Sequence, residues 1–535
     1  MRLSDRIRAR GVAAAVAAAL IAPVAGTPAK AQIQIEFTAF AQTVAETAAR
    51  DGDLSAFYRD REFSGLWTGT GEEAQMRRNA FLGALADAHI HGLPEARFNP
   101  EQAMMILRSA RTPQEKAEAE VAMTRLFLDY ARALNTGVLE PREVVSQIRR
   151  EVQHKDRQEL LASFAENPLG MLQSLPPSSP EYQRLVRAKM SLERTLAAGG
   201  YGPTVQATIR PGDSGSDVVR LRDRLRAMGY IGRTMTASYD REMVEAVEEF
   251  QADMGLEVDG VVGGATLEAL NMGALERLES VLVAMERERW MNNIERGDRH
   301  IWVNLPDFTA TIVDDGAVSF RTKSVIGTAD VDRQTPEFSD EMDHMVINPY
   351  WYVPRSIIEN EYLPDIRRNR NAHGQLQVIN RQGQVVSRGA VRTGGSFPYS
   401  MRQPPGPSNA LGRVKFMFPN QYNIYLHDTP AQHLFTRAVR AYSHGCIRLD
   451  DPYEFAYALL ALQEDDPESF FQTRLRSGQN TRVNLEQTVP VHLVYRTAFT
   501  DVDGKLQFRD DIYGRDARIW DALAREGVAI RSVSG

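Results

Sequence analysis

Two stretches, Ile424-Tyr-Leu-His427-Asp-Thr-Pro430 and Ser443-His-Gly-Cys446-Ile-Arg-Leu-Asp450, place two histidines near the only cysteine of a 535-residue chain. A cysteine attacks as its thiolate, which a neighbouring base generates. Alternation before His427 predicts a short strand, and a glycine before Cys446 permits a tight turn. We therefore expect Cys446 to be the nucleophile of a Cys–His acyl-transfer site. From the residues alone, His427 and His444 are equal candidates for the base.

Composition and charge exclude several classes of function. The formal net charge is -7, so the chain has no global positive field that would attract nucleic acid. A single cysteine cannot form a CxxC pair, and the sequence contains neither HExxH nor a glycine-rich phosphate loop. We therefore predict no metal, no cofactor and no nucleic-acid partner.

The first 31 residues have the pattern of a signal peptide. Arginines precede an apolar run from Val12 to Ala25, and Ala29-Lys-Ala31 is a small-residue cleavage site. The run is short for a membrane span, although an uncleaved N-terminal membrane anchor is the alternative. Export strengthens the case for a reactive Cys446, because one cysteine cannot form an intramolecular disulfide in an oxidising compartment.

Residues 32–204 are predicted to form a helical scaffold domain. The clearest helix begins at Thr112, where Pro113 and Glu115 complete a capping box, and it ends near Gly137. Apolar residues at helical spacing fill the interval. This region indicates architecture and carries no chemical motif.

Residues 205–272 are predicted to form a compact unit of three helices separated by glycine-rich turns. The unit resembles the small peptidoglycan-binding domain in the following positions: Leu221, Leu225, Gly229-Tyr230, Ala246-Val247, Phe250-Gln251, Gly255-Leu256, Asp259-Gly260-Val261 and Thr266. A three-helix module that binds nothing is the alternative. A linker follows at 273–298, with a helix expected to bury one apolar side that includes Leu278 and Trp290.

A β-rich domain is predicted at 299–497. Strands are expected at 299–305, 309–313 and 318–326, with Asp314-Asp-Gly316 as a hairpin turn. Residues 355–411 form a long insertion, which is typical of a lid over an active site. Its arginine cluster, Arg367, Arg368 and Arg370, is either a solvated face or a contact for an anionic peptide.

The segment after the cysteine motif is predicted to be helical. Asp451 is the expected N-cap, and Phe455, Leu459 and Leu462 supply the inward face. Residues 498–535 form a C-terminal unit. There we expect a hairpin that pairs 489–497 with 504–508, followed by a helix at 517–526.

His427 and Ser443-His-Gly-Cys446-Ile-Arg448 together resemble the signature of the L,D-transpeptidases with a YkuD-type catalytic domain. That signature places a histidine about fifteen residues before Ser/Thr-His-Gly-Cys, and residues 428–442 fill this interval. The domain order further resembles the large Gram-negative subgroup. The resemblance implies a multidomain α+β protein: a helical scaffold, a peptidoglycan-binding-like module, and a β-rich, sandwich-like catalytic domain with a capping insertion.

The resemblance also implies an activity and its partners. Cys446 would attack a tetrapeptide stem between diaminopimelate and the terminal D-Ala, with His427 as the base. The amine of a second diaminopimelate would resolve the thioester, giving a 3→3 cross-link in the periplasm. The family further implies inactivation by carbapenems and contacts with other cell-wall synthesis proteins.

The remaining candidate residues have supporting roles. The backbone N–H groups around Gly445 and Cys446 are candidates for the oxyanion site. Positioning roles are expected for Ser443, His444 and Arg448, with Arg448 a partner for a substrate carboxylate or for Asp450. Substrate contacts are expected from Tyr425, Trp351 and Asn348.

Three alternative functions fit the same sequence. The thioester would instead be passed to the amine of a protein, which attaches that protein to peptidoglycan, or to water, which makes the chain a hydrolase. In a different class, the chain would be a noncatalytic wall-binding scaffold that acts through residues 205–272. The paired Cys446 and His427 disfavour the last alternative, because a binding protein needs neither residue.

Overall fold

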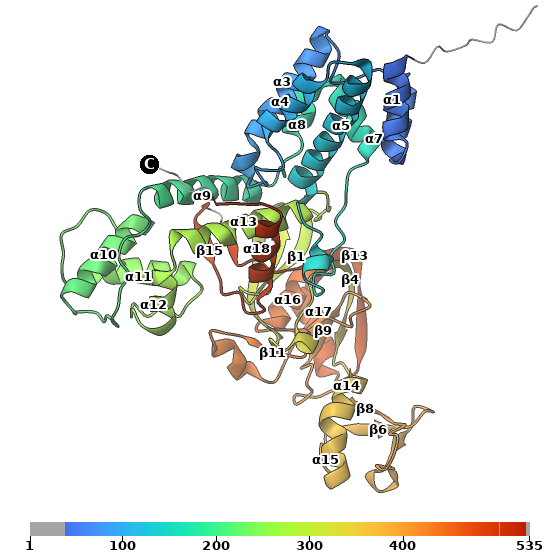
Figure 1. The fold of residues 1–535 in the computed structure, drawn as a ribbon. Coiled ribbons are helices and arrows are strands. Elements are labelled where there is room, and N and C mark those ends of the chain that lie inside the picture. Colours follow the sequence, from blue (N-terminus) through green and yellow to red (C-terminus); the bar gives the residue numbers. More distant parts are fainter. Residues whose placement is uncertain (1–37, 502, 531–535) are drawn as a thin grey trace, which may run out of the picture.

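The structure is a computed structural model that describes residues 38–501 and 503–530. It shows a helical N-terminal bundle, a small helical module on one side, a central β-rich domain and an insertion that projects away from it (Figure 1). The predicted signal peptide lies outside the described residues. Within the described residues, no helix combines the length and apolar character needed to cross a membrane.

The N-terminal bundle is built around α5, which is 24 residues long. Its predicted capping box is confirmed, since Thr112 and Glu115 each accept the other's backbone N–H. Trp67 is fully buried against it, and the buried carboxylate of Glu120 accepts N–H groups from the turn that carries this tryptophan. The helices of this region are α1 (Ala39–Ala48), α2 (Gly52–Asp60), α3 (Glu72–Ala86), η1 (Ala88–His91), α4 (Pro100–Ser109), α5 (Pro113–Thr136), α6 (Pro141–Val144), α7 (Arg157–Glu166), α8 (Pro168–Gln173) and α9 (Pro180–Ala197). The last of them, α9, lies outside the bundle and packs along α13 (Figure 1).

The predicted three-helix unit is present as α10 (Ser216–Met228), α11 (Arg241–Asp253) and α12 (Gly264–Asn271). Gly229 ends α10 in the left-handed conformation, which glycine adopts without strain. The unit packs on the C-terminal hairpin, where Arg509 donates to the carbonyl of Asp253 at 2.7 Å and Lys505 pairs with the Asp253 carboxylate at 2.6 Å.

The linker helix α13 (Ala274–Trp290) differs from the prediction, because it is buried on all sides along its second half. Three of the charges there are compensated inside the protein: Arg287 pairs with Glu337 and Asp516 at 2.7 Å each, and Glu286 pairs with Arg289 at 2.6 Å. The prediction of a single buried side was wrong because Glu337 and Asp516, the partners of Arg287, come from distant parts of the sequence.

The β-rich domain contains a nine-stranded sheet in the order β11-β3-β12-β10-β9-β4-β13-β1-β2, and an additional pairing of β2 with β3 closes it. The three predicted strands at its start are confirmed, and α16 and α17 pack on it. Its elements are β1 (Arg299–Asn304), β2 (Thr309–Asp314), β3 (Ala317–Gly327), η2 (Val331–Arg333), β4 (Phe338–Ile347), β9 (Val414–Met417), β10 (Leu426–His427), η5 (Gln432–Thr436), β11 (Ala441–Ser443), β12 (Ile447–Leu449), α16 (Pro452–Leu460), α17 (Pro467–Arg476) and β13 (Thr481–Val494).

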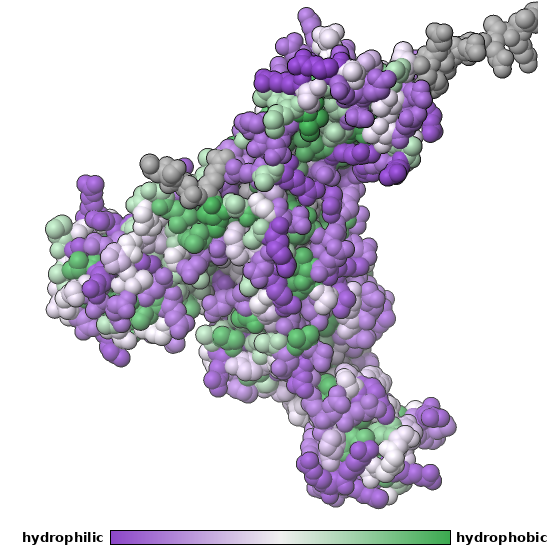
Figure 2. Space-filling view, in the orientation of Figure 1, coloured by the Kyte–Doolittle hydropathy of each residue, from purple (hydrophilic) through white to green (hydrophobic). Residues whose placement is uncertain are grey.

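The insertion has a small hydrophobic core of its own, separate from that of the main sheet. Its four-stranded sheet has the order β5-β8-β6-β7. The elements are β5 (Trp351–Tyr352), α14 (Arg355–Ile357), the π-helical turn η3 (Ile358–Tyr362), α15 (Leu363–Arg368), β6 (Gln377–Ile379), β7 (Val385–Val386), η4 (Arg388–Ala390) and β8 (Ser400–Gln403). Its surface is mostly hydrophilic in Figure 2.

Two predictions for the C-terminal region need correction. Residues 489–494 belong to β13 in the main sheet, and the terminal hairpin instead pairs β14 (Ala498–Thr500) with β15 (Leu506–Phe508). Leu462 lies beyond the end of α16 and is exposed. The final helix α18 (Arg515–Arg525) is present and packs against α13.

Candidate active site

The sheet brings the two halves of the signature together. Strands β10 and β12 are parallel neighbours, with Leu426 opposite Ile447 and His427 opposite Arg448. Because side chains alternate along a strand, His427 and Arg448 face the same side as Cys446, which immediately precedes β12. Fifteen intervening residues therefore separate two groups that the fold places on one surface.

This surface faces a cavity of about 920 Å³ between the main sheet and the insertion. Most of the predicted site residues line it: Cys446, His427, Ser443, His444, Arg448, Tyr425 and Trp351. Sequence reasoning missed five charged residues of the lining: Asp332, Arg333, Arg355, Glu361 and Lys415. The cavity therefore combines one nucleophile, two imidazoles and several charges.

Cys446 is half-buried, and its thiol is directed to the carbonyl oxygen of Asn423 at 3.5 Å. Burial raises the pKa of this thiol to about 11, while Tyr425, Arg448 and Lys415 oppose the shift by stabilising the thiolate. At neutral pH the resting group is therefore the thiol, and a base must remove its proton during attack.

His427 is suited to that role. Its Nδ1–H donates to the carbonyl oxygen of Asp428 at 2.5 Å, a tautomer that leaves the lone pair on Nε2. Burial lowers the pKa of His427 to about 3, and the nearby charge of Arg448 adds to the shift. The imidazole is therefore neutral at physiological pH and can accept a proton.

Asp428 supports His427 in a way that the sequence reasoning missed. Its carboxylate accepts the backbone N–H groups of Arg413 at 2.7 Å and Thr429 at 2.6 Å. Gly412 has φ +59°, and a Cβ there would lie 2.2 Å from the Asp428 carboxyl carbon. Only glycine fits this approach, so the segment that orients His427 depends on Gly412.

The loop before Cys446 is held by Ser443. Its hydroxyl donates to the Cys446 carbonyl at 2.5 Å and accepts the Gly445 N–H at 3.0 Å. Gly445 has φ +112°, and Thr335 holds its carbonyl at 2.8 Å. The Gly445 N–H is thus occupied, whereas the Cys446 N–H has no acceptor in the part of the chain that the structure describes. Of the two expected oxyanion donors, Cys446 N–H is the one that is free.

His444 points to the insertion. Its Nε2 lies 2.7 Å from Glu361 Oε1, and Arg333 donates to the same oxygen at 2.9 Å. Glu361 belongs to η3, so this carboxylate joins the insertion to the loop of the nucleophile. Nothing in the local sequence signals this contact, because the three residues come from separate segments.

Arg448 faces the cavity with no carboxylate partner. Burial lowers its pKa, and its Nε is buried without an acceptor among the described residues. The expected pair with Asp450 is not formed, because no ion pair joins these two described residues. Lys415, whose pKa is also lowered by burial, stands 5.4 Å from the ring centre of Tyr425. The wall beside the thiol is therefore cationic.

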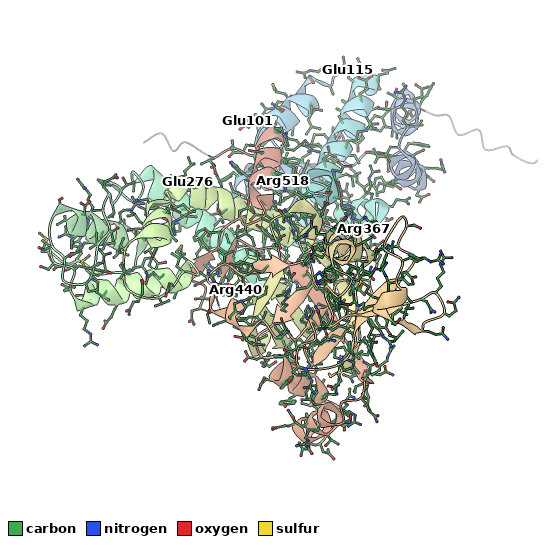
Figure 3. All side chains as sticks on the ribbon, turned by 90° about the horizontal axis from the view of Figure 1, so that it is seen from below. Glu101, Glu115, Glu276, Arg367, Arg440 and Arg518 are labelled. Carbon is green, nitrogen blue, oxygen red and sulfur yellow. The ribbon has the colours of Figure 1, made fainter. Side chains whose placement is uncertain are left out.

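Of the three residues predicted to contact substrate, two line the cavity and one does not. Tyr425 and Trp351 line the cavity, but Asn348 does not. Asn348 is buried, and its amide donates to the carbonyl of Leu475 at 3.0 Å while its oxygen accepts from Arg413. Asn348 therefore has a structural role, because it holds the backbone at the end of α17. The arginine cluster of the insertion also lies outside the cavity lining: Arg367, labelled in Figure 3, donates to the carbonyls of two nearby loop residues.

No group of three or more metal-binding side chains occurs in the described ranges 38–501 and 503–530.

Comparisons with known families assign three parts of the chain. Residues 298–482 match the L,D-transpeptidase catalytic domain of the YkuD family. Residues 52–188 match a family described as "Scaffold domain", and residues 214–270 match one described as "Putative peptidoglycan binding domain". The matches follow the order predicted from the sequence.

A curated relative supports the assignment. A "Putative L,D-transpeptidase" of Haemophilus influenzae is 32% identical over 236 residues, which is 42% of this chain. The alignment spans 47% of that relative's length. The chain therefore matches about half of the relative.

Two crystal structures also match in part. The L,D-transpeptidase (residues 123–326) of Xylanimonas cellulosilytica has 16% identity and a TM-score of 0.18, over 55% of this chain and 100% of that one. The L,D-transpeptidase of Stackebrandtia nassauensis has 14% identity and a TM-score of 0.22, over 55% and 97%. On the three family matches, the chain contains a YkuD-type L,D-transpeptidase catalytic domain together with a scaffold domain and a peptidoglycan-binding domain.

Proposed function

We propose that the protein is a periplasmic L,D-transpeptidase that forms 3→3 cross-links in peptidoglycan through a thioester on Cys446. The observation that carries the proposal is the pairing of β10 with β12, which sets a neutral His427 and the Cys446 thiol on one face of a large cavity. The catalytic-domain match supports the reaction class, and the peptidoglycan-binding match supports the polymer.

In the first half-reaction, Cys446 Sγ attacks the carbonyl that joins diaminopimelate to the terminal D-Ala of a tetrapeptide stem. His427 Nε2 takes the thiol proton as the S–C bond forms. The same nitrogen then gives that proton to the D-Ala amine as the C–N bond breaks. The thioester remains on Cys446, and D-Ala leaves.

The Cys446 N–H is the donor we assign to the oxyanion of this step, because the Gly445 N–H is already bound to Ser443. Losing one such donor typically costs about 2.7–4 kcal/mol of transition-state stabilisation. Arg448 and Lys415 add positive charge beside the reacting carbonyl. They also leave a site for a stem carboxylate, because Arg448 lacks a carboxylate partner among the described residues.

In the second half-reaction, the side-chain amine of diaminopimelate on another stem attacks the thioester. His427 accepts its proton and returns a proton to sulfur as the thiolate leaves. The product links position three of one stem to position three of the other. Acylation of the same thiol by a carbapenem would block both steps.

The peptidoglycan-related domains indicate a location outside the cytoplasm. We assign the periplasm and a cleaved signal peptide from the basic and apolar N-terminal pattern.

The test is product analysis by mass spectrometry. The chain from residue 32 onward is incubated with disaccharide-tetrapeptides. We expect dimers that have lost one D-Ala, and none with the Cys446→Ala variant. Tripeptides without dimers would instead establish hydrolysis. Absence of both D-Ala release and dimers would reject the proposal and favour a wall-binding scaffold.

A further inference from the structure

A second groove, of about 530 Å³, lies where the scaffold domain meets the catalytic domain. Residues between 142 and 153 form one side, and the start of β4 forms another. Asn420 and Tyr422 line both this groove and the catalytic cavity. The two hollows therefore meet at the loop that contains these residues, next to Asn423, which holds the Cys446 thiol.

Arg149 is fixed in this groove by its backbone. Its N–H donates to the Glu337 carbonyl at 2.8 Å, and the Glu337 N–H donates to the Gln147 carbonyl at 3.0 Å. These two bonds form an isolated parallel β-bridge between Ile148 and Glu337, just before β4. The guanidinium of Arg149 stands 5.8 Å from the ring centre of Tyr422. Its side chain is thus placed on the wall shared with the catalytic cavity.

The charge of Arg149 is not neutralised. No carboxylate pairs with it among the described residues, and its Nε is buried without an acceptor. Arg150 beside it is also buried and donates to the neutral Ser339 hydroxyl and Leu493 carbonyl. By contrast, Arg142 in the same groove pairs with Glu151 at 3.2 Å.

Two more carboxylates belong to the lining. Glu295 is exposed, and Asp340 is half-buried and accepts the Glu341 N–H. The groove therefore offers the unpaired guanidinium of Arg149 together with separate acidic groups. Such a lining suits a ligand that carries both carboxylates and an amine, as a diaminopimelate-containing stem does.

We propose that this groove is a peptide-stem subsite in which Arg149 binds a stem carboxylate. The proposal rests on the transpeptidase function proposed above and gives the scaffold domain a direct part in substrate recognition. A planar guanidinium presents two parallel N–H donors to a carboxylate, and stacking on Tyr422 preorganises it. The carboxylate belongs either to the donor stem or to the acceptor stem.

Direct binding tests the proposal without requiring turnover. In the Cys446→Ala background, calorimetry measures the affinity for a tetrapeptide stem and for a tripeptide stem, each with all of its carboxylates free or all of them amidated. We expect Arg149→Gln to weaken binding of at least one free-acid stem about tenfold, the effect of losing one charge-assisted hydrogen bond. The amidated form of that stem should bind both proteins equally.

Two controls separate the site from the fold. Arg108→Gln removes an exposed scaffold arginine that lines none of the cavities described, and its affinity should match that of the parent. The melting temperature of Arg149→Gln should stay close to that of the parent, because the bridge to Glu337 uses only backbone atoms.

The stem that loses affinity identifies the source of the carboxylate: loss for the tetrapeptide alone indicates the donor, and loss for the tripeptide indicates the acceptor. Equal affinities of parent and Arg149→Gln for every stem would overturn the proposal. An equal loss for free-acid and amidated stems would also overturn it, since no carboxylate would then be read. Failure of thioester formation in the active protein would reject the transpeptidase function but leave these affinities measurable.

Discussion

The catalytic domain is held by charged contacts on two sides, and the two sets differ in burial. Towards α13 and α18, Glu337 pairs with Arg287 and Arg515, and Arg287 also pairs with Asp516; these side chains are 0–9% exposed. Towards the insertion, Glu361 contacts Arg333 and His444, and these side chains are 32–40% exposed. We call the first set the buried junction and the second the open junction.

The difference in burial determines how much stability is lost when each set of contacts is broken. Removing one partner from a buried ion pair leaves an uncompensated charge in a low dielectric, whereas water readily replaces the partner of an exposed charge. The buried junction therefore fixes the linker helix α13 and the C-terminal helix α18 to the sheet. The open junction lets the insertion separate from the loop of Cys446 at little cost, as entry and exit of a polymeric substrate require.

The largest expected effect comes from breaking the buried junction. Glu337→Gln should destabilise the protein by about 3–5 kcal/mol, because it leaves Arg287 and Arg515 short of negative charge. Chemical denaturation followed by hydrogen exchange at α13 and α18 measures the loss. An unchanged midpoint and unchanged protection there would show that this network does not hold the domains together.

Lowering the pH should destabilise the protein through protonation of His492. This residue is buried between Ser339 and the Arg296 carbonyl, and burial lowers its pKa to about 3. A folded pKa below the unfolded value of 6.5 means that its contribution is complete above pH 6.5 and is lost as the pH falls towards 3. Between pH 7 and pH 5 the loss is about 2 kcal/mol from this residue.

The variant His492→Gln isolates that effect. Its melting temperature should fall less steeply than that of the parent between pH 7 and pH 5, although it starts lower. Parallel pH profiles would mean that His492 does not titrate as its burial indicates.

The smallest expected change in stability belongs to the open junction. Glu361→Gln should change the free energy of unfolding by less than about 1 kcal/mol, since the groups are half-exposed. Hydrogen exchange in residues 355–368 should nevertheless become faster, because the insertion loses its attachment.

Glu359→Gln is the matched control. Glu359 lies on the same turn, and among the described residues it pairs only with its helical neighbour Arg355. Equal exchange in the two variants would show that Glu361 does not secure the insertion.

The sequence was most informative where local rules act. The capping box of Thr112 and Glu115 predicted a helix that the structure contains. The spacing of His427 and Cys446 predicted a site, and both residues line one cavity. These signals need only short stretches of chain. The same holds for the hairpin strands at the start of the sheet, whose turn residues are adjacent.

The sequence was least informative where distant charges meet. The linker helix was expected to bury one side, but Glu337 and Asp516 allow Arg287 to be buried as well. The link between Glu361 and His444 was missed for the same reason. Asn348 is expected to contact substrate, yet it has a φ of +52° and its amide binds backbone carbonyls near α17.

The most direct test of this account is the rate at which Cys446 becomes acylated by a tetrapeptide stem, followed by intact-protein mass. The parent should gain the mass of the stem without its D-Ala, and Cys446→Ala should gain nothing. His427→Ala should acylate about 10²–10⁴-fold more slowly, because the resting thiol loses its base. Equal rates for His427→Ala and the parent, or an adduct on Cys446→Ala, would contradict the proposed roles of this pair.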